Sequence, residues 1–119
     1  MEAARDIEVM VMGQLEVRPA EAIALAAGRP LNLSVREFGL LVELARRRDR
    51  IVGREDLFAR VWGTTLRDGD RSVDVYVHKL RAKLDEALPE WSFILTLVGF
   101  GYRLSAEPSH PFHNDTTGR

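Results

Sequence analysis

Cations and hydrogen-bond donors recur with helical spacing in the segment 71–84, and they are the side chains best suited to chemistry in this sequence. An apolar stripe runs through the segment at spacings of four, three and four residues: Val73, Val77, Leu80 and Leu84. At about 100° per residue, the opposite side of such a helix carries Arg71, Val75, His78, Lys79 and Ala82, with Ser72, Asp74, Tyr76 and Arg81 on its flanks. A helix with one apolar side and one donor-rich side can pack on a domain and still enter the major groove of DNA.

The charge of the chain is unevenly distributed. Its 119 residues carry 17 basic and 18 acidic side chains, a formal net charge of −1. The segment 71–84 holds four basic residues and one acidic residue, a net of +3, which leaves −4 for the rest of the chain. Because a polyanion responds to the local field more than to the net charge, this segment is compatible with nucleic-acid binding.

The composition indicates an ordinary globular domain, with 45% hydrophobic and 29% charged residues. No apolar run approaches the roughly 18 residues of a membrane span, and the N-terminus lacks the apolar region of a signal peptide. There is no cysteine, which excludes disulfides, zinc–thiolate sites and thiol nucleophiles. We therefore expect a cytoplasmic protein without a membrane partner.

Enzyme chemistry has little support in the sequence. His78 lies among cations without a carboxylate at catalytic spacing, and Pro111 prevents a helical metal pair between His110 and His113. The glycines of 99–101 join two β-rich runs, whereas a phosphate-binding loop joins a strand to a helix. We expect no enzyme, no cofactor, no metal site and no small-molecule ligand in this domain.

Two regions precede the basic segment. Alternation and glycine breaks predict an antiparallel sheet over 7–33, with strands at 7–12, 15–18, 22–27 and 31–33. The alanines of 22–27 are also compatible with a helix.

Ser34 and Glu37 form a capping-box pattern, which begins a helix that buries Phe38, Leu41, Leu44 and Ala45. The arginines at 46–48 and 50 are either a second phosphate site or a solvated helix end. Residues 51–52 form an extended link to a second helix that starts near residue 54 and buries Leu57, Phe58, Val61 and Trp62.

A polar loop over 63–70 leads to the basic helix, and a hairpin over 93–104 follows it. Helix, helix, loop, basic helix and hairpin form the order of a winged helix-turn-helix. The predicted fold is therefore α+β: a winged helix-turn-helix with an N-terminal antiparallel four-stranded sheet, three helices and a C-terminal β-hairpin wing. We place a tail at 1–6, the domain at 7–106 (sheet 7–33, helices and wing 34–106) and a disordered tail at 107–119.

Four linked patterns in this order resemble the OmpR/PhoB-type effector domain, the DNA-binding output domain of bacterial response regulators. They are Leu33-x-x-Arg36-Glu37-Phe38, then Val52-x-Arg54-Glu55-x-Leu57 with Val61-Trp62-Gly63, then Arg71-x-Val73-Asp74-Val75-x-Val77-x-x-Leu80-Arg81-x-Lys83-Leu84, and finally Thr96-Leu97-Val98-Gly99-Phe100-Gly101-Tyr102-Arg103. The resemblance covers roughly residues 7–105. It implies a third helix that reads the major groove and a preceding loop that contacts RNA polymerase: Thr64, Thr65, Leu66, Arg67 and Asp68.

The resemblance also implies the roles of individual residues. Phosphate contacts are expected from Arg71, Ser72, Tyr76, His78 and Arg81, base contacts from Val75 and Lys79, and further backbone contacts from Arg54, Trp62, Thr96 and Tyr102. Chemically, Lys79 suits guanine and Val75 suits a thymine methyl group. Trp62 and Tyr102 suit core packing as well as DNA contact, and Asp74 suits a pair with a neighbouring arginine.

The sequence departs from the family in the wing, where Val98 stands in the place of a basic residue that many members carry. This departure puts minor-groove reading by the wing in doubt. We predict sequence-specific binding to double-stranded DNA in bacterial transcription regulation, as tandem copies on a direct-repeat operator. The alternative is a protein-interaction module that contacts RNA polymerase or a fused partner domain.

Overall fold

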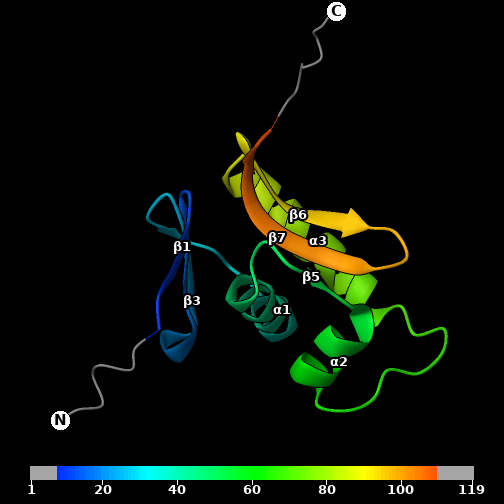
Figure 1. Cartoon of the computed structure of the whole chain (residues 1–119). Helices are drawn as coiled ribbons and strands as arrows, with labels where there is room; N and C mark the ends of the chain where they lie inside the picture. The colour runs from blue at the N-terminus through cyan, green and yellow to red at the C-terminus, as the bar shows by residue number, and fades with distance from the viewer. Residues whose placement is uncertain (1–7, 110–119) are drawn as a thin grey trace, which may run out of the picture.

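The structure is a computed structural model that describes residues 8–109. Its elements are β1 (Met10–Met12), β2 (Leu15–Arg18), a short 3-10 helix η2 (Pro19–Glu21), β3 (Ile23–Ala26), β4 (Arg29–Pro30), α1 (Val35–Arg46), β5 (Ile51–Val52), α2 (Arg54–Trp62), α3 (Ser72–Ala87), β6 (Trp91–Leu97) and β7 (Gly101–Pro108). Helix α1 lies between the N-terminal sheet and the second sheet, and α3 runs along the second sheet (Figure 1). The predicted winged helix with three helices and two β regions is confirmed.

The N-terminal sheet is antiparallel throughout, in the order β1-β2-β3-β4. Its alternation places one set of side chains in the core: Met10, Met12, Leu15, Val17, Ala24 and Ala26. Residues 23–26 form a strand, as predicted, but 31–33 do not. The fourth strand is instead β4 at residues 29–30, after which the backbone N–H of Leu31 still donates to the carbonyl of Ala24 at 2.8 Å before the chain turns toward α1. Ile7, at the start of the predicted sheet, lies outside the described residues.

The capping box of α1 is confirmed. The backbone N–H of Glu37 donates to Ser34 Oγ at 3.2 Å, and the backbone N–H of Ser34 donates to Glu37 Oε1 at 2.9 Å. Glu37 is nevertheless buried, and its second partner is Lys83 Nζ at 2.7 Å, far along the chain in α3. Burial alone would raise the pKa of Glu37, but hydrogen bonds from Lys83 and Ser34 outweigh it and lower the pKa below its usual range.

The second sheet has three strands in the order β5-β7-β6. The predicted link at 51–52 is strand β5, in which Val52 pairs with Tyr102. The hairpin is longer than the predicted 93–104, because β6 starts at Trp91 and β7 continues to Pro108. Residues 107 and 108 therefore belong to this sheet, although we placed them in the tail, and the backbone N–H of Ser109 donates to the carbonyl of Glu90.

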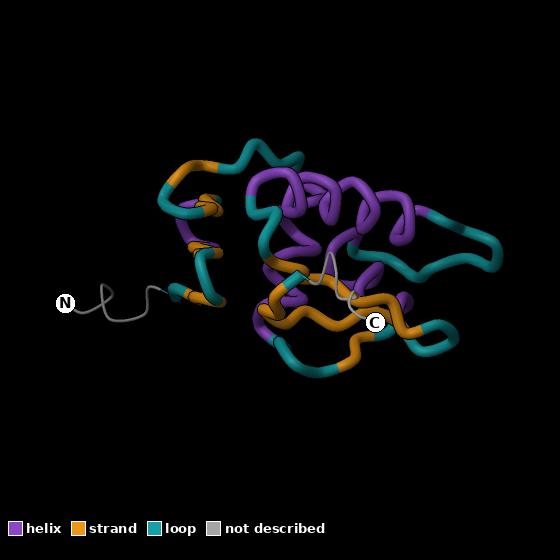
Figure 2. The backbone as a smooth tube through the Cα atoms, turned by 90° about the horizontal axis from the view of Figure 1, so that it is seen from above, coloured by secondary structure: helices purple, strands orange, loops and turns teal. Residues whose placement is uncertain are grey.

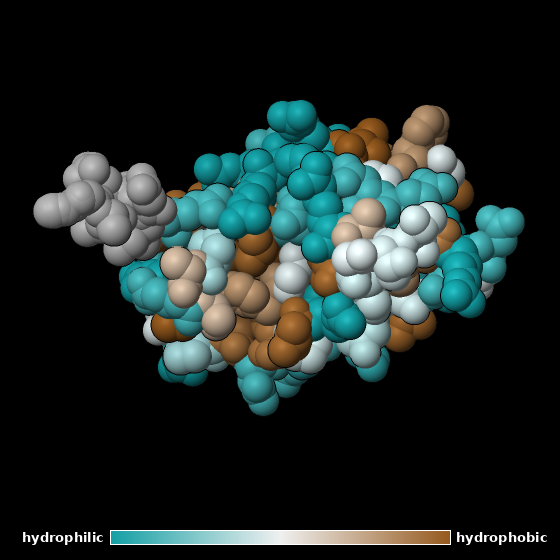
Figure 3. Space-filling model, turned by 90° about the horizontal axis from the view of Figure 1, so that it is seen from below, coloured by the Kyte–Doolittle hydropathy of each residue, from teal (hydrophilic) through white to brown (hydrophobic). Residues whose placement is uncertain are grey.

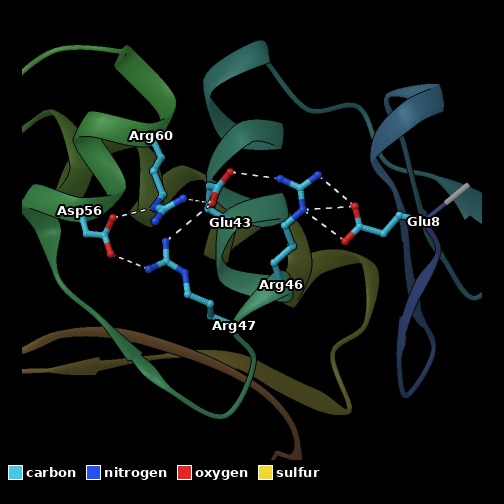
Figure 4. A network of polar contacts seen from close by, with 6 residues as sticks. All are labelled: Glu8, Glu43, Arg46, Arg47, Asp56 and Arg60. Carbon is cyan, nitrogen blue, oxygen red and sulfur yellow. Dashed lines mark hydrogen bonds and ion pairs between the residues drawn. The ribbon is translucent and has the colours of Figure 1, made fainter. Parts of the chain in front are cut away.

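Of the two roles predicted for the arginines at the end of α1, the exposure of Arg46, Arg48 and Arg50 agrees with a solvated helix end. Arg46 and Arg47 also take part in an ion-pair network that the sequence did not predict (Figure 4). Its ion pairs join Arg46 to Glu8 at 2.9 Å and to Glu43 at 3.3 Å, Arg47 to Asp56 at 2.5 Å, and Arg60 to Asp56 at 2.7 Å. Arg48 donates to the carbonyl of Val11 in β1 at 2.8 Å. The segment therefore ties α1 to α2 through Arg47 and to the N-terminal sheet through Arg48, while Arg46 reaches Glu8 just before that sheet.

Within residues 8–109, no helix is long and apolar enough to cross a membrane, and no group of His, Asp and Glu side chains is suited to hold a metal ion. The face seen from below is largely hydrophilic, with several separate apolar groups among the polar atoms (Figure 3). His110 and His113, whose pairing we considered above, lie outside the described residues.

Candidate nucleic-acid interface

Helix α3 has the two sides that the sequence predicts. The stripe Val73, Val77, Leu80 and Leu84 is buried in the core. All five residues expected on the opposite side are exposed, namely Arg71, Val75, His78, Lys79 and Ala82, whereas the four flanking residues are half-buried. The helix is thus held from one side and offers the other to a ligand. It extends past residue 84 to Ala87 and ends just before Pro89, which cannot continue it.

The start of α3 is held by Asp70. Its Oδ1 accepts hydrogen bonds from the backbone N–H of Ser72 at 2.8 Å and from the Ser72 hydroxyl at 2.6 Å. These two bonds lower the pKa of Asp70 below its usual range. The Ser72 hydroxyl, expected at a phosphate, therefore donates within the protein. Asp70 was not among the residues predicted to act here, although an Asp just before a helical pattern is an ordinary start signal.

Asp74 joins three elements at the front of α3. Its carboxylate accepts from Arg71 Nε at 2.9 Å, lies 3.2 Å from Arg54 Nε of α2, and accepts a short hydrogen bond from the Tyr102 hydroxyl of β7. Burial alone would raise the pKa of Asp74, but the hydrogen bonds from Tyr102 and Arg71 and the charge of Arg54 lower it. The predicted pairing of Asp74 with a neighbouring arginine is confirmed.

Tyr102 is a core residue. Its side chain is 6% exposed and its hydroxyl is directed at Asp74, so of the two roles that the sequence allowed, the structure favours packing over DNA contact. Burial, followed by the hydrogen bond to Asp74, raises the pKa of Tyr102 to about 12. The phenol therefore stays protonated at physiological pH and continues to donate.

Arg81 and Thr96 contact each other. Arg81 Nη2 donates to Thr96 Oγ1 at 2.7 Å, which links the middle of α3 to the wing strand β6. Both were expected to contact DNA. Thr96 is exposed and Arg81 is half-buried, so this pair fixes the wing relative to the helix at the edge of the exposed side.

Trp62 is half-buried in an aromatic cluster. Its ring stacks on Phe58 with centroids 4.8 Å apart and meets Tyr76 of α3 edge-on at 5.6 Å. The Arg36 guanidinium lies 4.9 Å from the Trp62 ring centroid, and Lys79 Nζ lies 4.9 Å from that of Tyr76. The contact between Trp62 and Tyr76 thus packs α2 against α3 and helps to hold α3 in place. No sequence signal pointed to Arg36, because its partners lie more than 20 residues away.

The distribution of charge on α3 differs from the predicted basic segment. Lys83 Nζ donates to Glu37 and to the carbonyl of Asn32 on the core side, so it does not contribute to the exposed side. Arg71 is partly neutralised by Asp74. Lys79 and His78 remain fully on the exposed side, which concentrates the local positive charge around Lys79.

An open groove of about 440 Å³ lies between the helices and the turn of the wing. Arg54, Glu55, Arg71 and Asp74 line its helical side, and residues 96–102 line the other.

The loop 63–70 and the turn of the wing project from the end of the molecule at which α3 begins (Figures 1 and 2). In that loop Thr64, Thr65, Arg67 and Asp68 are exposed, whereas Leu66 packs against the core.

A helix with a buried stripe and an exposed donor-rich side, joined to a hairpin wing, defines the class of winged-helix DNA-binding domains. Comparison with known proteins gives the family. Residues 28–104 match the family model "Transcriptional regulatory protein, C terminal", and the chain belongs to this family of OmpR/PhoB-type effector domains. The family consists of DNA-binding domains of transcription regulators and not of enzymes.

Individual relatives agree with this assignment. The chain is 36% identical to the alkaline phosphatase synthesis transcriptional regulatory protein SphR of Synechococcus elongatus over 76% of the chain, and it spans 35% of that relative's length. It resembles the DNA-binding domain of CpxR from Escherichia coli (TM-score 0.76, 32% identity, 84% of this chain and 99% of that one). It also resembles the RstA DNA-binding domain of Klebsiella pneumoniae in complex with the RstA box (TM-score 0.74, 32% identity, 82% and 97%).

Asp74→Asn should destabilise the domain by about 2 kcal/mol at neutral pH, because charge-assisted hydrogen bonds to the carboxylate are lost. The folded pKa of Asp74 is lowered, so its contribution is complete above the unfolded pKa of about 4 and is lost as the pH falls through the folded value. The free energy of unfolding, measured with urea, should therefore differ between wild type and variant at neutral pH, and this difference should become smaller below about pH 4.

Asp85→Asn serves as the control, because it removes an exposed acid from the same helix. It should change the free energy of unfolding by no more than about 0.5 kcal/mol. If Asp74→Asn lowers the free energy of unfolding by the same amount at low and at neutral pH, the role given to the carboxylate charge is wrong.

Proposed function

We propose that this domain binds double-stranded DNA sequence-specifically, with α3 in the major groove and the hairpin as the wing. The observation that carries the proposal is the exposed side of α3, where Lys79 lies one turn from Val75 above a fully buried stripe. Lys79 donates to guanine O6 or N7, and Val75, which is 47% exposed, contacts a thymine methyl group.

Phosphate contacts surround this reading surface. Arg71 and His78 are exposed on α3, and Arg54 lies in the groove beside the wing. Arginine has five N–H donors, so Arg54 and Arg71 keep donors for phosphates while they pair with Asp74. Ser72, Tyr76, Arg81, Thr96 and Trp62 lie at the edges of the same surface, where contacts within the protein fix their positions.

We propose further that two copies bind head to tail on a direct repeat. A single copy presents few unpaired cations on α3, so it displaces few counterions and binds weakly, and a second copy on the same duplex compensates for this. The chain spans less than half of the length of relatives such as SphR. We propose that it acts in the cytoplasm as the output part of a two-component phosphorelay.

Selection of bound fragments from a random duplex pool at two salt concentrations tests both proposals. Enrichment of a repeated half-site, with binding that weakens as salt rises, is the expected result. Enrichment of single half-sites would contradict the tandem arrangement. If no duplex binds even at low salt, the DNA-binding function is wrong for this chain.

Lys79→Ala should weaken binding to the selected duplex by roughly 1–3 kcal/mol, because one base contact is lost. Lys83→Ala is the matched control: it removes the same charge from the same helix, but Lys83 is bonded to Glu37. The control should lower the free energy of unfolding and leave the affinity of the folded protein nearly unchanged. Equal losses of affinity in both variants would show that only the total charge of α3 matters.

We also propose that the loop around 64–68 contacts RNA polymerase. Four of its five side chains are exposed, and it projects beside the wing, where a protein next to the DNA can reach it (Figure 1). The double variant Arg67→Ala with Asp68→Ala leaves Leu66 in the core. It should keep the DNA affinity and reduce activated transcription severalfold in a purified system. Unchanged transcription, or a parallel loss of DNA affinity, would overturn this proposal.

A further inference from the structure

A line of four side chains connects α1, α2 and α3 and ends at Lys79. The guanidinium of Arg36 in α1 lies 4.9 Å over the ring of Trp62 in α2, and that ring meets Tyr76 of α3 edge-on at 5.6 Å. The ammonium of Lys79 lies 4.9 Å over the ring of Tyr76. Arg36, Trp62 and Tyr76 are half-buried, whereas Lys79 is exposed. A side chain of α1, which carries none of the proposed DNA contacts, is thus linked to the proposed reader of a base.

Arg36 ties the end of α2 to α1. Its Nη1 donates to the carbonyl of Val61 at 2.8 Å, which gives a partner to one of the carbonyls that the last turn of a helix leaves free. Gly39 lies one turn later in α1, and a Cβ there would lie 3.0 Å from Val61 Cγ1, so the two helices approach closely at this point. A guanidinium is planar and has five donors, so Arg36 donates to Val61 and covers the Trp62 ring at the same time.

Phe58 holds the Trp62 ring in a different way. The two rings are stacked, with centroids 4.8 Å apart and an angle of 7° between their planes, and Phe58 is buried. Because Phe58 lies one turn earlier in the same helix, this contact does not fix the ring relative to α1. Arg36 supplies that link. The position of the Trp62 ring in turn limits where the Tyr76 ring can lie, because the two rings are in edge-on contact.

Lys79 needs support of this kind to read a single base pair, because its side chain is a point charge on a flexible four-carbon stem. Tyr76 lies three residues earlier on α3, and the attraction between its ring face and the ammonium favours rotamers that point to this side of the helix. The ammonium has three donors, so its contact with the ring leaves donors for guanine. A side chain that is ordered before binding loses less entropy on binding and reaches fewer alternative bases.

Building on the proposed function, we propose that Arg36 is a positioning residue for base reading. By holding the Trp62 ring, and through it Tyr76, Arg36 keeps the ammonium of Lys79 at one base pair. Arg36 itself contacts neither base nor phosphate. Its loss should therefore reduce the preference for guanine and leave the number of phosphate contacts unchanged, whereas a purely structural tie would affect stability alone.

Arg36→Gln tests this on two duplexes, the selected one and one in which A·T replaces the G·C pair read by Lys79. That pair is identified as the one at which Lys79→Ala loses the preference of the wild type. The wild type should prefer guanine by on the order of tenfold, and Arg36→Gln should reduce this preference severalfold. The slope of log affinity against log salt should stay that of the wild type.

Arg47→Gln is the matched control. Arg47 is also a half-buried arginine that joins α1 to α2, but its partner is the carboxylate of Asp56 in the first turn of α2. Both variants should lower the free energy of unfolding, and only Arg36→Gln should lose the preference for guanine. An equal loss of preference in both variants would show that general loosening of the helices is the cause, which overturns the proposal.

A double variant shows whether Arg36 acts through Lys79. In the Lys79→Ala background the base contact is absent, so adding Arg36→Gln should change the affinity for the selected duplex by less than about twofold. A further loss as large as that in the wild-type background would mean that Arg36 acts by another route, which overturns the proposal.

NMR of the free domain tests the positioning without DNA. The ring of Tyr76 shifts the signals of the Lys79 methylene group next to the ammonium, because these protons lie close to the ring face. Arg36→Gln should move these signals toward those of an unstructured lysine, and Arg47→Gln should leave them unchanged. Signals that stay in place in Arg36→Gln would overturn the proposal.

The outcomes separate this proposal from the proposed function. If the wild type binds no duplex, the proposed function fails, and the NMR signals of Lys79 still decide whether Arg36 positions it. If the wild type binds and Lys79→Ala weakens binding, but Arg36→Gln keeps the preference for guanine, only the proposal for Arg36 is overturned. A smaller salt slope in Arg36→Gln would show that Arg36 contacts a phosphate, which also overturns it.

Discussion

One carboxylate, that of Asp74, determines how the parts of the DNA-binding surface are placed relative to one another. It accepts from Tyr102 of the wing sheet, pairs with Arg54 of α2, and pairs with Arg71 at the start of α3. The negative charge of an acid in a basic helix by itself opposes DNA binding. Here it fixes the two guanidinium groups in place, and their other donors still face the groove.

The internal use of arginine explains why a chain of net charge −1 has a DNA-binding surface. Arg46, Arg47 and Arg60 are taken up by Glu8, Glu43 and Asp56 in the network that joins the N-terminal sheet to α1 and α2. Glu8, Glu43 and Asp56 are thus neutralised away from the front of α3. The local field there is set by Lys79 and its neighbours, which the net charge does not reveal.

The wing depends on packing of the backbone. Strand β5 pairs with β7, Gly101 allows the close approach, and the bond between Arg81 and Thr96 sets the hairpin against α3. Because the turn is supported from two sides, its apolar side chains have a definite place beside the groove. Val98 and Phe100 leave this turn without charge, and both side chains are mostly exposed.

The sequence by itself determined the features that depend on local spacing. The stripe of Val73 and its partners, the capping box of Ser34 and Glu37, and the exposed position of Lys79 follow from helical periodicity, which is a property of neighbouring residues. The tertiary structure alone decided which cation meets which acid. Lys83 reaches Glu37 across 46 residues and Tyr102 reaches Asp74 across 28, and no local pattern distinguishes these pairs from others of the same charge. Strand β5 could not be predicted for the same reason, because two residues become a strand only when a distant strand supplies their hydrogen bonds.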